Sequence, residues 1–156
     1  MSWFNPGQQN IIEKGVYHIK HGNEQVFQFA GKAGTGKTTV LKEMIRRIGI
    51  PLNRIACMAY IGQAAIVMRT RGLYNAKTVH SWLYEPILTP ILDEHGKQLR
   101  DLLYDTPLFK VEFVPRDLTD IDYIIVDEAR TLPMSMKKDL EATGKPIIAC
   151  VDAHQL

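Results

Sequence analysis

The stretch Gly31-Lys32-Ala33-Gly34-Thr35-Gly36-Lys37-Thr38 follows the pattern G-x-x-x-x-G-K-[ST], which is typical of a phosphate-binding loop. Its glycines let the backbone curl so that N–H groups converge on phosphate oxygens. A helix that begins at Lys37 would present the positive end of its dipole to the same anion. In this chemistry Lys37 places its charge on the β- and γ-phosphates, and the Thr38 hydroxyl is a hard oxygen ligand for Mg²⁺. The stretch therefore predicts a site for Mg²⁺ and a nucleotide such as ATP.

The segments around this loop predict alternating strands and helices. Residues 37–48 carry apolar side chains at helical spacing, and residues 25–30 form a short strand-like run before the loop. Further strands are predicted at 54–59, 123–126 and 147–151, and further helices at 6–19, 63–69, 78–84 and 133–142. Residues 85–120 are the least regular part, because prolines at 86, 90, 107 and 115 interrupt any long element, and we expect loops with one hairpin there.

This alternation, with apolar strands, predicts an α/β fold with an open parallel sheet and helices on both faces. In such sheets ligands bind at the carboxyl ends of the strands. The polar motifs of the chain follow its predicted strands, so we expect them to gather at that edge.

An acidic pair, Asp127-Glu128, ends the most apolar predicted strand. ATPases with this type of loop hold the Mg²⁺ shell with a carboxylate at the end of a neighbouring strand. Asp127 is therefore the candidate metal ligand, and Glu128 the candidate base for an attacking water. Asp152 and Gln155 follow the last predicted strand, and Gln155 could hydrogen-bond both a water and a γ-phosphate oxygen.

Composition excludes several classes of protein. The chain has 156 residues, 46% hydrophobic and 23% charged, which predicts one globular domain. No apolar run approaches the roughly 20 residues of a membrane span, and the first residues do not resemble a secretory signal, so we expect a cytoplasmic protein without a membrane partner. Cys57 and Cys150 lie in strand-like runs and are predicted to be buried thiols. The net charge of +2 does not by itself indicate nucleic acid, and basic pairs such as Arg69 with Arg71 are typical of solvated helix faces.

Taken together, the motifs resemble the first RecA-like domain of superfamily 1 DNA helicases, in the 5′-to-3′ branch of RecD-like and phage Dda-like enzymes. The resemblance covers nearly the whole chain, in both order and spacing. Its parts are Phe4-Asn-Pro-Gly-Gln8 (Q motif), Gly31 to Thr39 (motif I), Gly62-Gln-Ala-Ala65 (end of motif Ia), Thr78-Val-His80 (T-x-H motif), Asp127-Glu-Ala129 (motif II) and Asp152-Ala-His-Gln155-Leu156 (motif III). The resemblance implies a P-loop NTPase of RecA-like fold that hydrolyses Mg-ATP and moves along single-stranded DNA.

The resemblance also implies residue roles. Glu128, Lys37 and Gln155 would be catalytic, with Gln155 sensing the γ-phosphate, and Thr38 and Asp127 would hold Mg²⁺. Nucleotide contacts would come from Gln8 (to adenine), Gly34, Thr35, Gly36, Lys37, Thr38 and Thr39. Contacts with the DNA strand would come from Gly62, Gln63, Thr78 and His80.

The chain departs from the family pattern at four positions. Tyr60 and Ile61 stand where Pro-Thr is usual, so a hydroxyl contact with a DNA phosphate is missing. Arg130 replaces a serine, and Val151 replaces a glycine. The chain also stops just after motif III, whereas the resembled enzymes continue into a second RecA-like domain. We therefore expect a fragment, a single ATP-binding domain with an irregular insertion at about 85–120, that unwinds little or no DNA alone.

Two alternatives stay open at the level of sequence. A P-loop kinase for small molecules shares the phosphate loop and usually adds a mobile lid that carries arginines, for which Arg100 and Arg116 are candidates. A non-catalytic module would bind nucleotide or DNA without turnover. The alternative roles are a surface amide of a helix for Gln8, a helix cap for Thr78 and a core histidine for His80.

Overall fold

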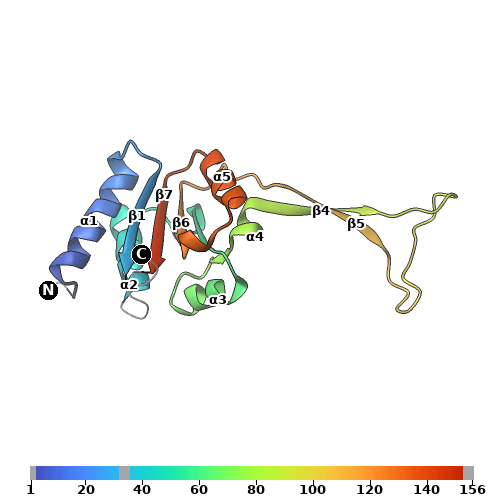
Figure 1. Cartoon of the computed structure of the whole chain (residues 1–156), viewed down its shortest axis with the longest axis horizontal. Coiled ribbons are helices and arrows are strands. Elements are labelled where there is room, and N and C mark those ends of the chain that lie inside the picture. Colours follow the sequence, from blue (N-terminus) through green and yellow to red (C-terminus); the bar gives the residue numbers. More distant parts are fainter. Residues whose placement is uncertain (1–2, 32–35, 153–156) are drawn as a thin grey trace. The chain divides into compact units, whose positions relative to one another are not determined.

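The computed structural model describes residues 3–31 and 36–152 and divides the chain into two compact units (Figure 1). The first unit comprises Met1–Leu83 and Asp117–Leu156, and the second comprises Tyr84–Arg116. Each unit is built from elements that contact one another within it.

The first unit is organised around a five-stranded parallel sheet. Its strands are β1 (Val26–Gly31), β2 (Ile55–Ala59), β3 (Lys77–Thr78), β6 (Tyr123–Asp127) and β7 (Ile147–Asp152), in the spatial order β1-β7-β6-β2-β3. Strands β2, β6 and β7 are central and almost wholly buried, which explains their continuous apolar sequences. The predicted α/β class, an open parallel sheet of the RecA-like P-loop type, is confirmed.

The described residues form five α-helices: α1 (Pro6–His21), α2 (Lys37–Ile48), α3 (Gly62–Thr70), α4 (Val79–Leu83) and α5 (Met134–Ala142). Short 3-10 turns lie at Leu52–Arg54 and Ala129–Thr131. The helix predicted at 37–48 has those bounds, and α1 begins as expected with Asn5 as its N-cap and Pro6 at the first helical position. None of the helices in the described part of the chain is both long and apolar enough to span a membrane.

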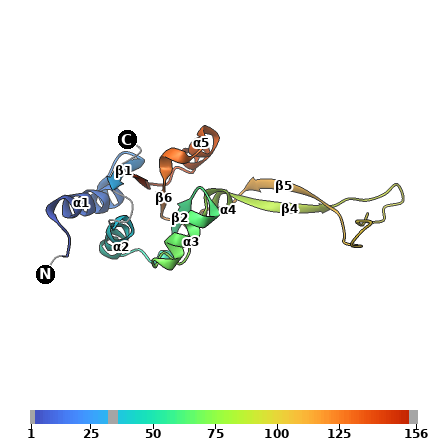
Figure 2. The same cartoon turned by 60° about the horizontal axis from the view of Figure 1, so that its bottom comes forward.

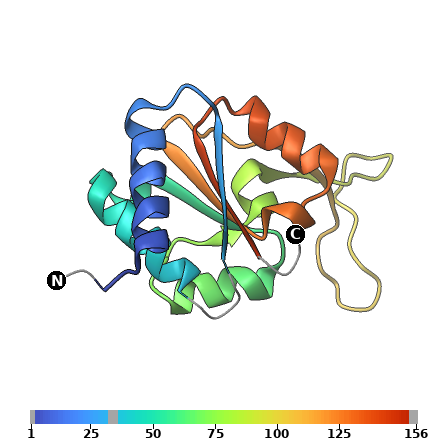
Figure 3. The ribbon, with the colours of Figure 1, turned by 60° about the vertical axis from the view of Figure 1, so that its left-hand side comes forward.

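Alternate side chains of the central strands face opposite helical layers. Ile125, Cys57 and Cys150 belong to a buried cluster with residues of α1, α2 and α3, whereas Val126 and Ala149 line a small cavity with residues of α5. In Figure 3, α1 and α2 (blue and teal) lie to the left of the strands and α5 (orange-red) to the right. Helices therefore cover both faces of the sheet, and both cysteines are buried as predicted.

The second unit is an antiparallel hairpin of β4 (Tyr84–Pro90) and β5 (Phe109–Pro115), which run side by side in Figure 2. Its seven cross-strand pairs extend from Tyr84 with Pro115 to Pro90 with Phe109. Because side chains alternate between the faces of a strand, one face carries only apolar residues. These are Tyr84, Pro86, Leu88, Pro90, Phe109, Val111, Phe113 and Pro115. The hairpin expected within residues 85–120 is thus present, with longer strands than their prolines suggest.

Candidate nucleotide-binding site

The predicted site residues lie at the carboxyl ends of the parallel strands. Strand β6 ends in Asp127, its neighbour β7 ends in Asp152, and β3, which lies beyond β2 in the sheet, ends in Thr78. Lys37 opens α2, the helix that follows β1 along the chain. The register places Asp127 opposite Ala59 of β2, and Ala59 also pairs with Thr78. Residues distant in sequence therefore share one edge of the sheet, as predicted for an open parallel sheet.

Lys37 lies between the two acidic residues of motif II. Its Nζ is 3.9 Å from Oδ1 of Asp127 and 3.5 Å from Oε1 of Glu128, and its side chain is only 13% exposed. Burial by itself lowers the pKa of Lys37, but Cys150, Asp127, Glu128 and Asp152 together raise this pKa above its ordinary value. Lys37 is therefore a fixed positive charge at neutral pH, as a phosphate ligand must be.

The approach of Lys37 to the sheet depends on a glycine. A Cβ atom at Gly31 would lie 2.6 Å from Cγ of Lys37, closer than atoms can pack. At the other end of the loop, Gly36 has φ of 87°, in the left-handed region that disfavours other residues. The structure thus gives a steric reason for glycine at two positions of the motif, Gly31 and Gly36.

Glu128 is held in a strained turn directly after β6. Its φ and ψ are 54° and 43°, a left-handed conformation that costs a non-glycine residue about 1–3 kcal/mol. The turn is fixed because the Glu128 N–H donates to Oδ1 of Asp127 (3.0 Å) and the Glu128 carbonyl accepts from Thr131 N (3.0 Å) and Oγ1 (2.7 Å). Within the described part of the chain, Oε2 of Glu128 is buried and has no hydrogen-bond partner. A buried carboxylate oxygen that no described residue pairs with can accept a hydrogen bond from a ligand or a water.

Two cavities lie against the start of α2. The smaller, of about 230 Å³, is lined by Lys37, Thr38, Asp127 and Glu128, together with residues of α3. The larger, of about 710 Å³, is lined by Phe4, Gly36, Thr38, Thr39, Lys42, Glu43, Arg46 and Arg71. The charged ends of motifs I and II therefore surround the smaller space, and an aromatic ring borders the larger one.

Gln8 lies beside the phosphate loop and also caps α1. Its Oε1 accepts from Asn5 N (3.1 Å), and its backbone N–H donates to Oδ1 of Asn5 (2.8 Å). A Cβ atom at Gly36 would lie 3.8 Å from Nε2 of Gln8, so this nitrogen faces the end of the loop. The capping role accounts for the carbonyl oxygen of the side chain and leaves its nitrogen directed toward the candidate site.

The donor set at this edge fits Mg²⁺ held together with a nucleotide. The described residues contain no cluster of three or more His, Cys, Asp or Glu side chains that could enclose a metal. Mg²⁺ usually takes one or two carboxylates and completes its shell with phosphates and water. Thr38 and Asp127 line the same small cavity and can supply the protein's ligands to Mg²⁺. Glu128 also lines this cavity, and its Oε2 is buried without a partner among the described residues.

The residues predicted to contact DNA lie at the β2 and β3 side of the same edge. Gly62 and Gln63 begin α3, and Thr78 ends β3. Thr78 also caps α4: its Oγ1 accepts from Ser81 N (3.1 Å) and donates to Ser81 Oγ (2.8 Å). His80 is a partly buried residue of α4. Thr78 therefore caps a helix, as the alternative interpretation predicted, and it also lies at the end of β3.

Three predicted residues, Gly34, Thr35 and Gln155, lie outside the described residues.

Two residues beside the site, Cys150 and Arg71, were not predicted from the sequence. Cys150 pairs in register with Asp127 and is hydrogen-bonded to its side chain. Burial, first of all, and the nearby Asp127 carboxylate raise the pKa of the Cys150 thiol to about 12. Arg71 lines both cavities, and no local pattern distinguishes it from Arg69, which donates to the Ala76 carbonyl instead.

Comparison with known proteins agrees with this geometry. The AAA domain family matches residues 16–156, which include the phosphate loop, the acidic pair and all five strands of the sheet. No curated protein matches the chain. P-loop domains of this kind bind ATP, and they occur in helicases. The chain belongs to the AAA domain family of P-loop NTPases.

Proposed function

We propose that this chain is the ATP-hydrolysing half of a DNA helicase motor of the 5′-to-3′ superfamily 1 branch, which couples Mg-ATP hydrolysis to movement on single-stranded DNA. One observation carries the proposal. Ala59 of β2 pairs with Asp127 on one side and with Thr78 on the other, so the candidate metal ligand and the candidate DNA contacts are two strands apart on one edge. A nucleotide-dependent shift at β6 could therefore reach the start of α3 directly.

The chain's own residues account for the ATPase chemistry. Lys37 binds and orients the β- and γ-phosphates, and Thr38 and Asp127 hold Mg²⁺, which neutralises charge that develops on the phosphate oxygens. Glu128 has one oxygen 3.5 Å from Nζ of Lys37 and one that is buried without a partner among the described residues, and it accepts the proton of the attacking water. Gln8 contacts the adenine, and Gly34, Thr35, Gly36 and Thr39 contribute to the phosphate cradle.

An arginine supplied by a second domain is worth about 10³–10⁵ in turnover where such systems use one. A second RecA-like domain is the partner that the helicase proposal requires. We therefore expect this chain alone to bind Mg-ATP, to release phosphate slowly and to separate no DNA strands.

The test combines DNA binding with phosphate release. Fluorescence anisotropy of a labelled unstructured single-stranded oligonucleotide should show binding that weakens in Gln63→Ala and His80→Ala but not in Lys138→Ala, which alters an exposed residue of α5. Phosphate release from Mg-ATP should rise with that DNA and disappear in Lys37→Ala.

Each other outcome identifies a different function. If phosphate release depends on Lys37 but DNA does not change its rate, and if no DNA binds, the helicase proposal is rejected and the chain is an ATPase of another kind. Nucleotide binding without any release, with or without DNA, would support a non-catalytic module. Transfer of phosphate to a metabolite would support a small-molecule kinase.

A further inference from the structure

Arg71 has a rigid place beside the candidate nucleotide site. It caps the carboxyl end of α3, and its N–H donates to the carbonyls of Val67 and Met68 (3.1 and 3.2 Å). Met68 and Leu73 anchor the turn because both are buried. Gly72 permits the turn with φ of 104°. The backbone of Arg71 is therefore fixed, and its exposed side chain points out from a defined position.

Arg71 stands where the two cavities meet. Of the described residues, only Thr38 and Arg71 line both the 230 Å³ cavity of Lys37, Asp127 and Glu128 and the 710 Å³ cavity that reaches Phe4. In a P-loop domain the group bound beside the loop Thr is the polyphosphate. A nucleotide with phosphates at Lys37 and base toward Phe4 would therefore pass its phosphate chain between Thr38 and Arg71.

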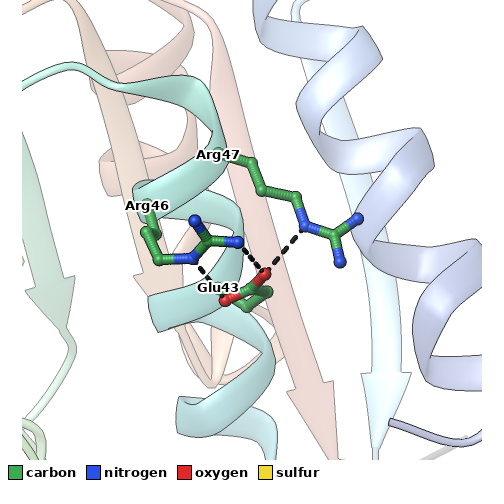
Figure 4. A network of polar contacts seen from close by, with 3 residues as sticks. All are labelled: Glu43, Arg46 and Arg47. Atoms are coloured by element: carbon green, nitrogen blue, oxygen red, sulfur yellow. Dashed lines mark hydrogen bonds and ion pairs between the residues drawn. The ribbon is translucent and has the colours of Figure 1, made fainter. Parts of the chain in front are cut away.

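The charges around Arg71 favour an anion. Within residues 3–31 and 36–152, no carboxylate forms an ion pair with Arg71. A second cation is close by, because a Cβ atom at Gly72 would lie 2.8 Å from Nζ of Lys42. Among the described residues that line the larger cavity, only Glu43 is acidic, and it already accepts hydrogen bonds from Arg46 (2.6 Å) and Arg47 (2.8 Å), as Figure 4 shows.

The engagement of Glu43 is strong. Hydrogen bonds from Arg46 and then Arg47 lower the pKa of Glu43 to about 2, so it stays ionised and bound to these two arginines at neutral pH. Within the described residues, Lys42 and Arg71 are thus adjacent cations that form no ion pair with a carboxylate, and both line the larger cavity. Such an arrangement suits a polyphosphate, which guanidinium groups bind through two parallel hydrogen bonds.

We propose that Arg71 binds the polyphosphate chain of the nucleotide from the α3 side, with Lys42 as a supporting charge. This inference rests on the proposed nucleotide site and adds to it a phosphate-binding arginine from the same chain. The turn after α3 would then respond directly to the presence of nucleotide, since Arg71 caps the helix that begins with Gly62 and Gln63.

The test measures calorimetric Kd values for Mg-ATP and for inorganic tripolyphosphate, which has no base or sugar. Charge-assisted hydrogen bonds predict that Arg71→Ala and Arg71→Gln weaken both ligands by roughly ten- to a hundredfold. Arg71→Lys, which keeps the charge and loses the paired hydrogen bonds, should fall between them and the unaltered chain. Lys138→Ala is the matched control and should bind both ligands normally, and thermal melting should show that all variants are folded.

The outcomes separate this inference from the nucleotide site itself. If Lys37→Ala abolishes binding and the Arg71 variants bind both ligands like the unaltered chain, the role of Arg71 is refuted while the site stands. Weaker ATP binding with unchanged tripolyphosphate binding would also overturn it, since the contact would be to base or sugar. If Lys37→Ala binds as well as the unaltered chain, the nucleotide site itself is misplaced.

Discussion

Glu128 combines backbone strain with an unsatisfied carboxylate, and the two have one structural cause. Asp127 and Thr131 hold the residue in the left-handed region, and this conformation leaves Oε2 buried without a partner in the described part of the chain. Strain of this kind persists only where surrounding contacts impose it, and it is concentrated at functional sites. At the scale of the residue, both features support the proposed role of Glu128 as the base in ATP hydrolysis.

Replacing Glu128 by Gln should separate catalysis from binding. The amide keeps the size of the side chain but is a poor proton acceptor, so phosphate release should fall by roughly 10²–10⁴, the usual contribution of a general base. ATP affinity should stay the same or improve, because a negative charge 3.5 Å from Lys37 is removed. Phosphate release and calorimetric binding measure the two effects, with Glu24→Gln as a control on an exposed carboxylate. Turnover within threefold of the unaltered chain would exclude Glu128 as the base.

The residue scale also shows why the sequence reveals only part of the site. Lys37, Thr38, Asp127 and Glu128 are predictable because loop geometry and phosphate chemistry restrict those positions to a few residue types. Arg71 is not, because its relation to Thr38 arises only when α3 packs beside α2. A cation on a helix end has the same local sequence whether it faces solvent or a phosphate.

At the scale of elements, α3 begins without a side-chain cap. Ile61 is the N-cap residue, with φ of −110° and ψ of 152°, and forms no side-chain hydrogen bond there. A Thr in this extended conformation can accept a hydrogen bond from an N–H of the first turn, which typically stabilises a helix by about 1 kcal/mol. The departure from Pro-Thr noted in the sequence therefore has a structural cost as well as a missing hydroxyl.

Ile61→Thr should therefore stabilise the chain, raising Tm by roughly 2–4 °C for a chain of this size. The matched control is Ile61→Val, which has nearly the shape of Thr and no hydroxyl. Ile61 is 56% exposed, so neither change leaves a cavity. Thermal unfolding followed by circular dichroism gives the comparison, and a Thr variant no more stable than the Val variant would show that the cap does not form.

The sequence predicted the long, strongly apolar elements accurately and the short or proline-containing strands poorly. The buried strands β6 and β7 and the helix α2 have strong apolar patterns, and their predicted bounds match the structure to within one residue. The two-residue strand β3 is too short to have a pattern. Strands β4 and β5 contain Pro86, Pro90 and Pro115, which argue against strands in a sheet interior but are tolerated in a two-stranded ribbon, where each strand has an open edge.

At the scale of the whole molecule, the two units differ in what stabilises them. All members of the main buried cluster belong to the first unit. The hairpin has no comparable core, and side chains such as Leu88 and Phe113 on its apolar face are more than half exposed. Isolated two-stranded hairpins are only marginally stable in water. The stability of the nucleotide site should therefore depend on the first unit alone.

Deleting the hairpin tests this independence. Tyr84 and Pro115 are cross-strand partners, so the ends of the first unit are close together and a four-residue Gly-Ser linker can join Leu83 to Asp117. We expect the shortened chain to melt cooperatively and to bind Mg-ATP within about twofold of the full chain, as for sites without shared partners. It should also aggregate less, because a contiguous apolar surface is removed. A full-length control with Leu88→Ser, Val111→Thr and Phe113→Ser should gain the same solubility while keeping the hairpin residues. Loss of ATP binding on deletion, measured by calorimetry, would show that the first unit needs the hairpin to form its site.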